Sequence, residues 1–334
     1  MKTLCIRAIA LAVFVATAFS GSISLAAPAA DNFPTSPIKF IVPFAAGGGS
    51  DTFCRALAPH FARELGTTMP VENVEGAGTQ IGMTALLNAP ANGYTIANAN
   101  QPHLAFTMAV QGAIYKPSDF AWLNIQQIDH SAFSVLPDKP WKNFKDFMDD
   151  IKARPGKIAI GATQMAGGHV FLFYLKHEYN LDFIIVPYPG GGEGRAALLG
   201  GHIDCYVGNE FSDYSLRGQV RPIAIGAPKR SDLWPDTPTI FESTGDKKLN
   251  DISTALASVR GVVVSRKFKD AYPERFNKLV EGYKKAYHSE AHMADCKKIG
   301  QIPIMFWTGP EEGDKMSAEA DKIIAEFAKY FIKK

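Results

Sequence analysis

Short apolar segments alternate with amphipathic segments along most of this chain of 334 residues. Apolar runs of about five residues, bounded by glycine, proline or polar residues, predict strands. They occur at Ile38–Pro43, Met69–Val74, Tyr94–Ala99, Ile158–Ala162, Phe183–Pro187, Ile203–Val207 and Pro222–Gly226. Helices are predicted at Thr52–Leu65, Thr79–Leu87, Val170–Tyr179, Ala196–Leu199, Glu274–Tyr287 and Glu311–Tyr330. This β-α-β order predicts an α/β fold whose parallel sheets are covered by helices.

Two glycine-rich loops of the same design lie far apart in the sequence. Gly47–Gly49 connects a predicted strand to a predicted helix, and Gly190–Gly192 does the same in the second half. Bare backbone at a helix start presents unpaired N–H groups and the positive end of the helix dipole, which together hold an anion. Because ligands of open α/β sheets bind at the carboxyl ends of strands, the two loops predict a small anion held from both sides.

The candidate ligand-binding residues belong to these loops or follow other strands. Those of the first loop are Phe44, Ala46, Gly47, Gly48, Gly49, Ser50 and Asp51. Those of the second loop are Tyr188, Gly190, Gly191, Gly192, Glu193 and Arg195. Asn100, Gln101, His103, Thr163, Gln164, His169 and Asn209 are neutral donors at strand ends, although such residues are also commonly just solvated.

Several of these side chains have two interpretations. Asp51 is expected to hold the helix start, since a carboxylate that faced an anion would repel it. Phe44 and Tyr188 either enclose the solute or pack in the core. Arg195 either pairs with a second carboxylate of the solute or pairs with Glu193 at the surface. If Glu193 instead faces the solute, it favours one that carries an amine.

The composition is ordinary for a soluble globular protein, with 46% hydrophobic and 20% charged residues. The N-terminus has a basic start (Lys2, Arg7), an apolar run over Ala8–Phe19 and then small residues, which predicts a cleaved signal peptide over residues 1–26 and a periplasmic location. An uncleaved membrane anchor is the alternative. Cleavage leaves 33 basic and 33 acidic residues, and this balance argues against nucleic acid or an anionic membrane as the partner.

The sequence offers no motif for catalysis or metal binding. No pair of histidines has ligand spacing, and neither a nucleophile elbow nor a phosphate-loop lysine occurs. We therefore expect no cofactor, no metal, no catalytic residue and no enzymatic activity. Signal-peptide cleavage would remove Cys5 and leave three cysteines, Cys54, Cys205 and Cys296, so at least one does not pair within the mature chain. A periplasmic hydrolase using His103 or His169, and a ligand sensor for a membrane kinase, are the rival functions.

A series of motifs in order along the chain resembles the Bug family of periplasmic solute receptors of tripartite tricarboxylate transporters. The motifs are residues 42–51, 71–73, 76–78, 92–95, 142–146, 154–157, 198–204 and 235–239. The chain departs from the usual family pattern at two places. Glu193-Gly194-Arg195 replaces a stretch that is usually uncharged, and the loop 163–169 replaces one that is usually rich in serine and glycine.

This resemblance implies a type II periplasmic-binding-protein-like fold, with two α/β lobes, a ligand cleft between them and two crossings that act as hinges. Lobe 1 is expected over residues 33–135 plus 257–334, and lobe 2 over residues 136–256. The implied ligand is a small mono- or dicarboxylate, and aromatic acids belong to the range considered. The implied partners are the membrane permease subunits of such a transporter, and the receptor itself is expected to be a monomer.

Overall fold

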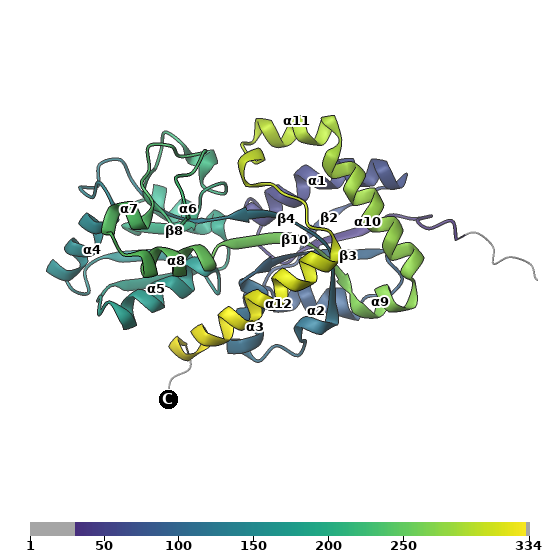
Figure 1. Cartoon of the computed structure of the whole chain (residues 1–334), viewed down its shortest axis with the longest axis horizontal. Coiled ribbons are helices and arrows are strands. Elements are labelled where there is room, and N and C mark those ends of the chain that lie inside the picture. The colour runs from purple at the N-terminus through teal and green to yellow at the C-terminus, as the bar shows by residue number, and fades with distance from the viewer. Residues whose placement is uncertain (1–30, 332–334) are drawn as a thin grey trace, which may run out of the picture. The chain divides into compact units, whose positions relative to one another are not determined.

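A computed structural model describes residues 31–331, and these form two five-stranded sheets (Figure 1). The expected signal peptide lies outside the described residues. The first sheet has the order β2-β1-β3-β10-β4 and contains β1 (Lys39–Val42), β2 (Val71–Asn73), β3 (Thr95–Gln101), β4 (Phe120–Asp129) and β10 (Ser258–Ser265). The second has the order β7-β6-β8-β5-β9 and contains β5 (Ser131–Val135), β6 (Ala159–Thr163), β7 (Ile184–Tyr188), β8 (Cys205–Asn209) and β9 (Arg221–Ile225).

Helices cover both sheets, as the alternation of segments predicts. Around the first sheet lie α1 (Gly49–Leu65), α2 (Gln80–Asn88), α3 (His103–Gln111), α9 (Arg266–Ala271), α10 (Pro273–His288) and α11 (Glu290–Lys298). Around the second lie α4 (Phe144–Ala153), α5 (Gly167–Glu178), α6 (Gly191–Leu199), α7 (Ile240–Thr244) and α8 (Lys247–Ala255). The last helix is α12 (Pro310–Phe327). Single 3₁₀ turns are η1 (Ala77–Thr79), η2 (Pro117–Asp119), η3 (Tyr214–Leu216), η4 (Ile302–Ile304) and η5 (Ala328–Tyr330).

All seven predicted strands and all six predicted helices form within a few residues of their expected bounds. The prediction of parallel sheets holds only in part. β1, β2 and β3 pair in parallel, and so do β6, β7 and β8. In contrast, β10 is antiparallel to β3 and β4, and β5 is antiparallel to β8 and β9. These antiparallel strands are the ones that follow a crossing from one sheet to the other.

The chain crosses between the sheets twice. It passes from β4 to β5 through the single residue His130, and it returns from α8 to β10 through Leu256 and Ala257. β5 therefore belongs to the second sheet, whereas the expected lobe boundary lies after this strand, between residues 135 and 136. The expected second boundary, near residue 256, coincides with the return to β10.

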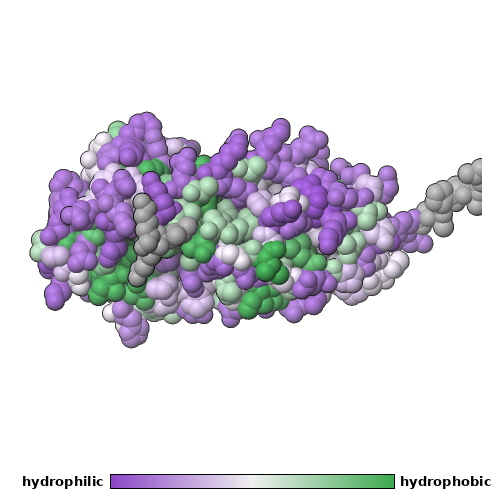
Figure 2. Space-filling model, turned by 90° about the horizontal axis from the view of Figure 1, so that it is seen from below, coloured by the Kyte–Doolittle hydropathy of each residue, from purple (hydrophilic) through white to green (hydrophobic). Residues whose placement is uncertain are grey.

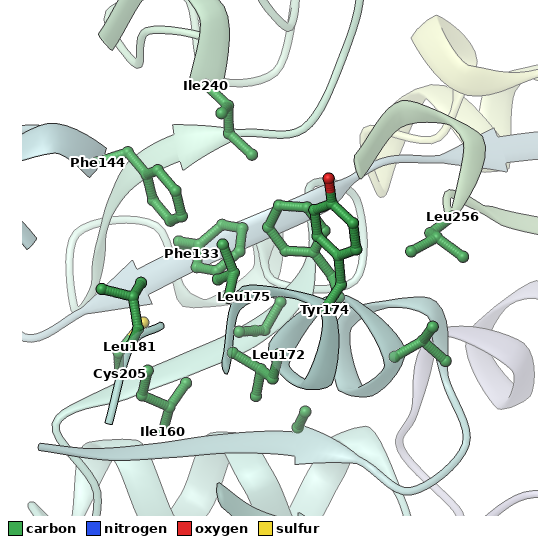
Figure 3. Close-up of a cluster of buried hydrophobic side chains, with 14 of the residues drawn as sticks. Phe133, Phe144, Ile160, Leu172, Tyr174, Leu175, Leu181, Cys205, Ile240 and Leu256 are labelled. Carbon is green, nitrogen blue, oxygen red and sulfur yellow. The ribbon is translucent and has the colours of Figure 1, made fainter. Parts of the chain in front are cut away.

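The larger apolar core packs against the second sheet (Figure 3). Its aromatic centre includes Phe133 from β5, which lies edge-on to Phe144 of α4 with ring centroids 4.6 Å apart. Other members shown are Ile160, Leu172, Tyr174, Leu175, Leu181, Cys205, Ile240 and Leu256. Ile324 and Phe327 of α12 join this core, although α12 also packs on β4 of the first sheet. The C-terminal helix thus ties the two sheets together.

The remaining observations concern cysteines and the surface. Cys54, Cys205 and Cys296 are all buried and free, so they pack as small apolar side chains. Hydrophilic residues cover most of the face in Figure 2, and its apolar residues fall in several separate areas. Between residues 31 and 331, none of the helices combines the length and hydropathy that crossing a bilayer requires.

Candidate functional site

A cavity of about 50 Å³ lies between the two sheets, at the carboxyl ends of β1, β3, β6 and β8. Ten of the twenty predicted ligand-binding residues line it. These are Phe44, Gly48, Gly49, Ser50, Asn100, His103, Thr163, Gly191, Arg195 and Asn209. Eight further residues complete the wall, and they are Ala45, Ala166, Tyr206, Gly208, Ser212, Asp213, Ser258 and Arg260. Sequence reasoning thus located the cavity but missed part of its lining.

The first glycine loop needs glycine for two different reasons. Gly47 has φ = +76°, a backbone conformation that side chains with a Cβ rarely adopt. At Gly49, a Cβ would collide with Ser212 Oγ and lie 3.0 Å from Arg260 Nη2. The loop therefore brings the start of α1 directly against residues from elsewhere in the fold.

Asp51 stabilises this loop through hydrogen bonds and does not line the cavity. Its carboxylate accepts the Gly47 N–H at 3.0 Å, Arg55 Nε at 2.9 Å and Asn73 Nδ2 at 3.0 Å. These donors outweigh the cost of burial and lower the pKa of Asp51. The expected role at the helix start is therefore the one observed, and Asp51 is removed from the candidate ligand contacts.

The second glycine loop meets the first across the cavity. A Cβ on Gly190 would lie 2.8 Å from the Cβ of Ala45, and one on Gly192 would lie 3.4 Å from the carbonyl oxygen of Ala46. Ala46, Gly47, Gly190 and Gly192 thus contact the facing loop instead of lining the cavity. Only small residues permit this approach, so the glycines serve closure as well as binding.

Three helices start at the cavity wall after a glycine or alanine, without a side-chain cap. They are α1 after Gly48, α5 after Ala166 and α6 after Gly190. Among the helices that start outside the cavity lining, α4, α7, α8, α9 and α11 are each capped by a side chain, whereas α2, α10 and α12 are not. The uncapped starts leave backbone N–H groups and the positive ends of three helix dipoles at one cavity, which is an arrangement for an anion.

Arg260 is a buried cation in the wall that the sequence did not reveal. Its Nη1 lies 2.6 Å from Asp129 Oδ2, and its Nη2 donates to Ser212 Oγ at 3.3 Å. Asp129 also accepts the Phe211 N–H at 2.8 Å and the Ser212 hydroxyl at 2.9 Å. Since Asp129 ends β4 whereas Phe211 and Ser212 follow β8, this network joins the two lobes beneath the cavity.

Arg195 does not pair with Glu193, one of the two partners considered from the sequence. It turns away from the exposed Glu193, and its Nη2 donates to the carbonyl oxygen of Gly47 at 2.6 Å. Its Nη1 lies 3.8 Å from Asp213 Oδ1. The surface pair with Glu193 is therefore wrong, and Glu193 is exposed outside the cavity lining.

Four other predicted residues point elsewhere. The Gln101 side chain accepts the Ala105 N–H and donates to Ser317 of α12. The Gln164 N–H donates to the Tyr188 carbonyl, and the Tyr188 side chain packs with the apolar cluster around Tyr206. His169 accepts the Met165 N–H through Nδ1, and its ring lies edge-on to Phe173 and tilted against Phe331. Tyr188 therefore follows the core-packing interpretation.

The neutral polar residues of the wall are held by one another. Thr163 Oγ1 and Tyr206 Oη are hydrogen-bonded at 2.9 Å, and Asn100 Oδ1 accepts the Ser258 hydroxyl at 2.8 Å. Asn209 Nδ2 donates to the Asp129 carbonyl at 2.9 Å. Phe44 lies edge-on to His103, with ring centroids 5.0 Å apart. Burial lowers the pKa of His103 to about 3, so its imidazole is neutral at physiological pH.

Several of the missed wall residues, and Asp129 as the partner of Arg260, lie on segments for which the sequence gave no expectation. Arg260 is on β10, Asp129 ends β4, and Ser212 and Asp213 lie in the turn after β8. The run Val262–Val264 of β-branched residues is a strand signal that was available. Nothing local indicates that Arg260 and Asp129, 131 positions apart, form a pair.

Residues 31–331 contain no cluster of three or more His, Cys, Asp or Glu side chains placed to hold a metal ion. The chemistry of the wall is instead that of an anion site, with dipoles, two guanidinium groups and hydroxyl and amide groups.

Known proteins match this chain along most of its length. The family model described as the tripartite tricarboxylate transporter family receptor, TctC, matches residues 53–293. The chain belongs to this receptor family. A relative from Cupriavidus necator, the UPF0065 protein in the gbd 5' region, is 28% identical over 316 residues, which cover 93% of this chain and 92% of that protein. BugT of Bordetella pertussis is 29% identical over 239 residues, covering 70% and 72%. The resemblance to the Bug family is thus confirmed.

Several solved structures share the fold of this TctC-family receptor. One described as a periplasmic transporter is 28% identical, with a TM-score of 0.79 over 89% of this chain and 97% of that one. An R. palustris protein solved with adipate is 21% identical, with a TM-score of 0.77 over 89% and 98%. MatC from Rhodopseudomonas palustris, solved with bound malate, is 20% identical, with a TM-score of 0.74 over 90% and 99%. These likenesses confirm the two-lobed α/β fold.

Proposed function

We propose that this solute receptor captures a small mono- or dicarboxylate in the cavity between its lobes and delivers it to the permease subunits of a tripartite tricarboxylate transporter. The observation that carries the proposal is the convergence of three uncapped helix starts, α1, α5 and α6, on one cavity that also contains Arg195 and Arg260. Helix N-termini and guanidinium groups both favour carboxylate oxygens.

Two further facts support a small carboxylate. The cavity of about 50 Å³ suits a compact solute. Two proteins of the same fold were solved with adipate and with malate, both of which are dicarboxylates. Neutral side chains such as Asn100, Thr163 and His103 would then select among acids by shape and hydrogen bonding.

Binding by lobe closure follows from where the contacts lie. Lobe 1 comprises residues 33–129 and 258–331, and lobe 2 comprises residues 131–255. The hinges are His130 and the segment Leu256–Ala257. The two glycine loops belong to different lobes, so opening at the hinges separates them and admits the solute. Export through a cleaved signal peptide over residues 1–26 completes the proposal, and N-terminal sequencing of the periplasmic protein tests it.

The test of carboxylate capture is calorimetry against a panel of organic acids, preceded by native mass spectrometry of the freshly purified protein. Gly191→Leu should abolish binding of whichever acid the wild type binds, because a Cβ there already lies 3.2 Å from Arg195 Nη1 and a longer side chain fills the cavity. Ala196→Leu is the matched control, since Ala196 is on the same helix but exposed. Equal affinity of the two variants would contradict the site.

A further inference from the structure

Asp213 is a buried acid in the cavity wall whose hydrogen bonding is incomplete. The residue is 0% exposed, and its Oδ2 accepts the Ser134 hydroxyl at 3.0 Å. Its Oδ1 has no hydrogen-bond partner and lies 3.8 Å from Arg195 Nη1, which is beyond hydrogen-bonding distance. Buried carboxylate oxygens normally accept hydrogen bonds, so a donor is missing at this atom.

The fold fixes the position of this carboxylate. Asp213 lies in the turn between β8 and η3, and its N–H donates to the Asn209 carbonyl at 2.9 Å. Its side chain rests on the backbone of Gly208, where a Cβ would collide with both carboxylate oxygens. The acid is therefore held in place before any solute enters.

A solute whose only polar groups are carboxylates gives no reason for an acidic side chain in this cavity wall. The helix starts, Arg195 and Arg260 attract negative charge, whereas Asp213 repels it. A solute that carries a hydrogen-bond donor next to a carboxylate meets both demands, since the carboxylate faces the helix starts and the donor faces Asp213 Oδ1.

We propose that Asp213 determines specificity by accepting a hydrogen bond from an ammonium or hydroxyl group of the solute, so that the receptor prefers amino or hydroxy acids to unsubstituted acids. This inference rests on the proposed carboxylate capture. It differs from a structural role of Asp213 beside Arg195, because that role would affect stability but would not distinguish between solutes.

Matched acids test the preference directly. The probes are three sets that differ only in one substituent, namely L-aspartate, L-malate and succinate; L-glutamate, L-2-hydroxyglutarate and glutarate; and L-alanine, L-lactate and propionate. In the set that binds most tightly, calorimetry should give an amino or hydroxy acid at least about 10-fold tighter binding than the unsubstituted acid, a difference of about 1.4 kcal/mol. Asp213→Asn should reduce that ratio to within about threefold.

Asp251→Asn is the control, because it removes one acidic charge from lobe 2 at an exposed position paired with Lys247. It should leave the ratio unchanged. Equal affinities within a binding set, or a ratio that survives D213N, would overturn the role of Asp213 while the carboxylate receptor stands. If none of the nine acids binds, the role of Asp213 is overturned, whereas the carboxylate receptor is decided separately by the wider panel of organic acids.

If D213N does not fold, the pH dependence of solute preference in the wild type tests the role of Asp213 instead. Burial raises the pKa of Asp213 to about 7, and Arg195, Ser134 and Asp129 modify it. Tyr206 and Cys205 also face it from β8, but burial raises their pKa values, so neither ionises between pH 6.5 and 8. An ammonium donor predicts that the preference weakens from pH 8 to 6.5, as Asp213 takes up a proton. A hydroxyl donor predicts a smaller change. A preference for the unsubstituted acid at pH 8 would contradict the proposal.

Discussion

The residues that decide the chemistry of this cavity are two buried arginines with acidic partners. Arg260 and Asp129 are 3% and 0% exposed and lie 2.6 Å apart. A buried pair of this kind adds little to stability over apolar residues, but removing one member leaves an uncompensated charge. The pair is therefore best understood as part of the cavity wall and of the contact between lobes.

Arg260→Met is expected to lower the free energy of unfolding by about 3–5 kcal/mol, because Asp129 then stays buried without its counter-charge. Arg230→Met removes an exposed pair with Glu242 and should cost at most about 1 kcal/mol. Urea denaturation of both variants measures the difference. Similar costs for the two would show that Asp129 is satisfied by Phe211 and Ser212 alone.

Asp213 should make stability depend on pH in an unusual direction. The pKa of Asp213 in the folded protein is about 7, above the ordinary value of 3.8, so the folded protein holds this proton more tightly than the unfolded chain. The resulting contribution to stability is complete below pH 4 and is lost as the pH rises through 7. In the absence of solute, the free energy of unfolding of D213N should therefore rise relative to that of the wild type by up to about 4 kcal/mol between pH 4 and 8. Denaturation at several pH values checks this, and a constant difference would mean that the carboxyl titrates normally.

At the scale of elements, three helices with a glycine or alanine at the N-cap position start at one cavity. Asn143, Thr239, Asp246, Ser265 and Ser289 cap helices outside the cavity lining. Glycine or alanine stands at the same position of α1, α5 and α6. A polar cap would stabilise each of these helices. At the cavity, the proposed carboxylate would accept from their free N–H groups instead.

Ala166→Asp should separate stability from binding. The residue has extended backbone, with φ −73° and ψ 163°, which suits a capping side chain. The substitution should stabilise the protein by about 0.5–2 kcal/mol and weaken carboxylate binding at least about 10-fold, since the new carboxylate occupies the anion position. Ala166→Asn is the uncharged comparison and should weaken binding less. Thermal unfolding and calorimetry measure the two effects, and undiminished affinity in A166D would remove α5 from the site.

At the scale of the whole molecule, contacts between lobes hold the cavity closed. Arg195 of α6 donates to the Gly47 carbonyl, and the glycine loops touch on either side of it. The Asp129 network forms the floor. Each of these contacts joins residues from different lobes, so closure and solute binding should be coupled.

Arg195→Ala is expected to weaken binding at least about 10-fold and to reduce the compaction that solute causes, because the cross-lobe hydrogen bond is lost. Arg221→Ala is the matched control, since Arg221 donates to the carbonyls of Trp141 and Lys139 within lobe 2. Small-angle scattering with and without solute follows the compaction. If both variants close equally well, Arg195 acts on the solute only.

Much of the fold was predictable because its signals are local. Runs such as Phe183–Pro187 identify strands, and Gly47–Gly49 and Gly190–Gly192 identify the two loops. The strands β4, β5 and β10 were not predicted, and with them the antiparallel pairing and the position of the first crossing were missed. Their partners are distant in sequence, so pairing rather than local pattern defines them.

The sequence by itself determined the α/β order, the two glycine loops and half of the cavity wall, since periodicity and backbone freedom are properties of neighbouring residues. Only the tertiary structure decided that Arg195 turns to Gly47, that Arg260 pairs with Asp129, and that Asp213 faces the cavity with one oxygen unpaired. These contacts arise when segments more than a hundred positions apart pack together or when a tight turn fixes one side chain. Packing and burial, which act over such separations, leave little trace in any local pattern.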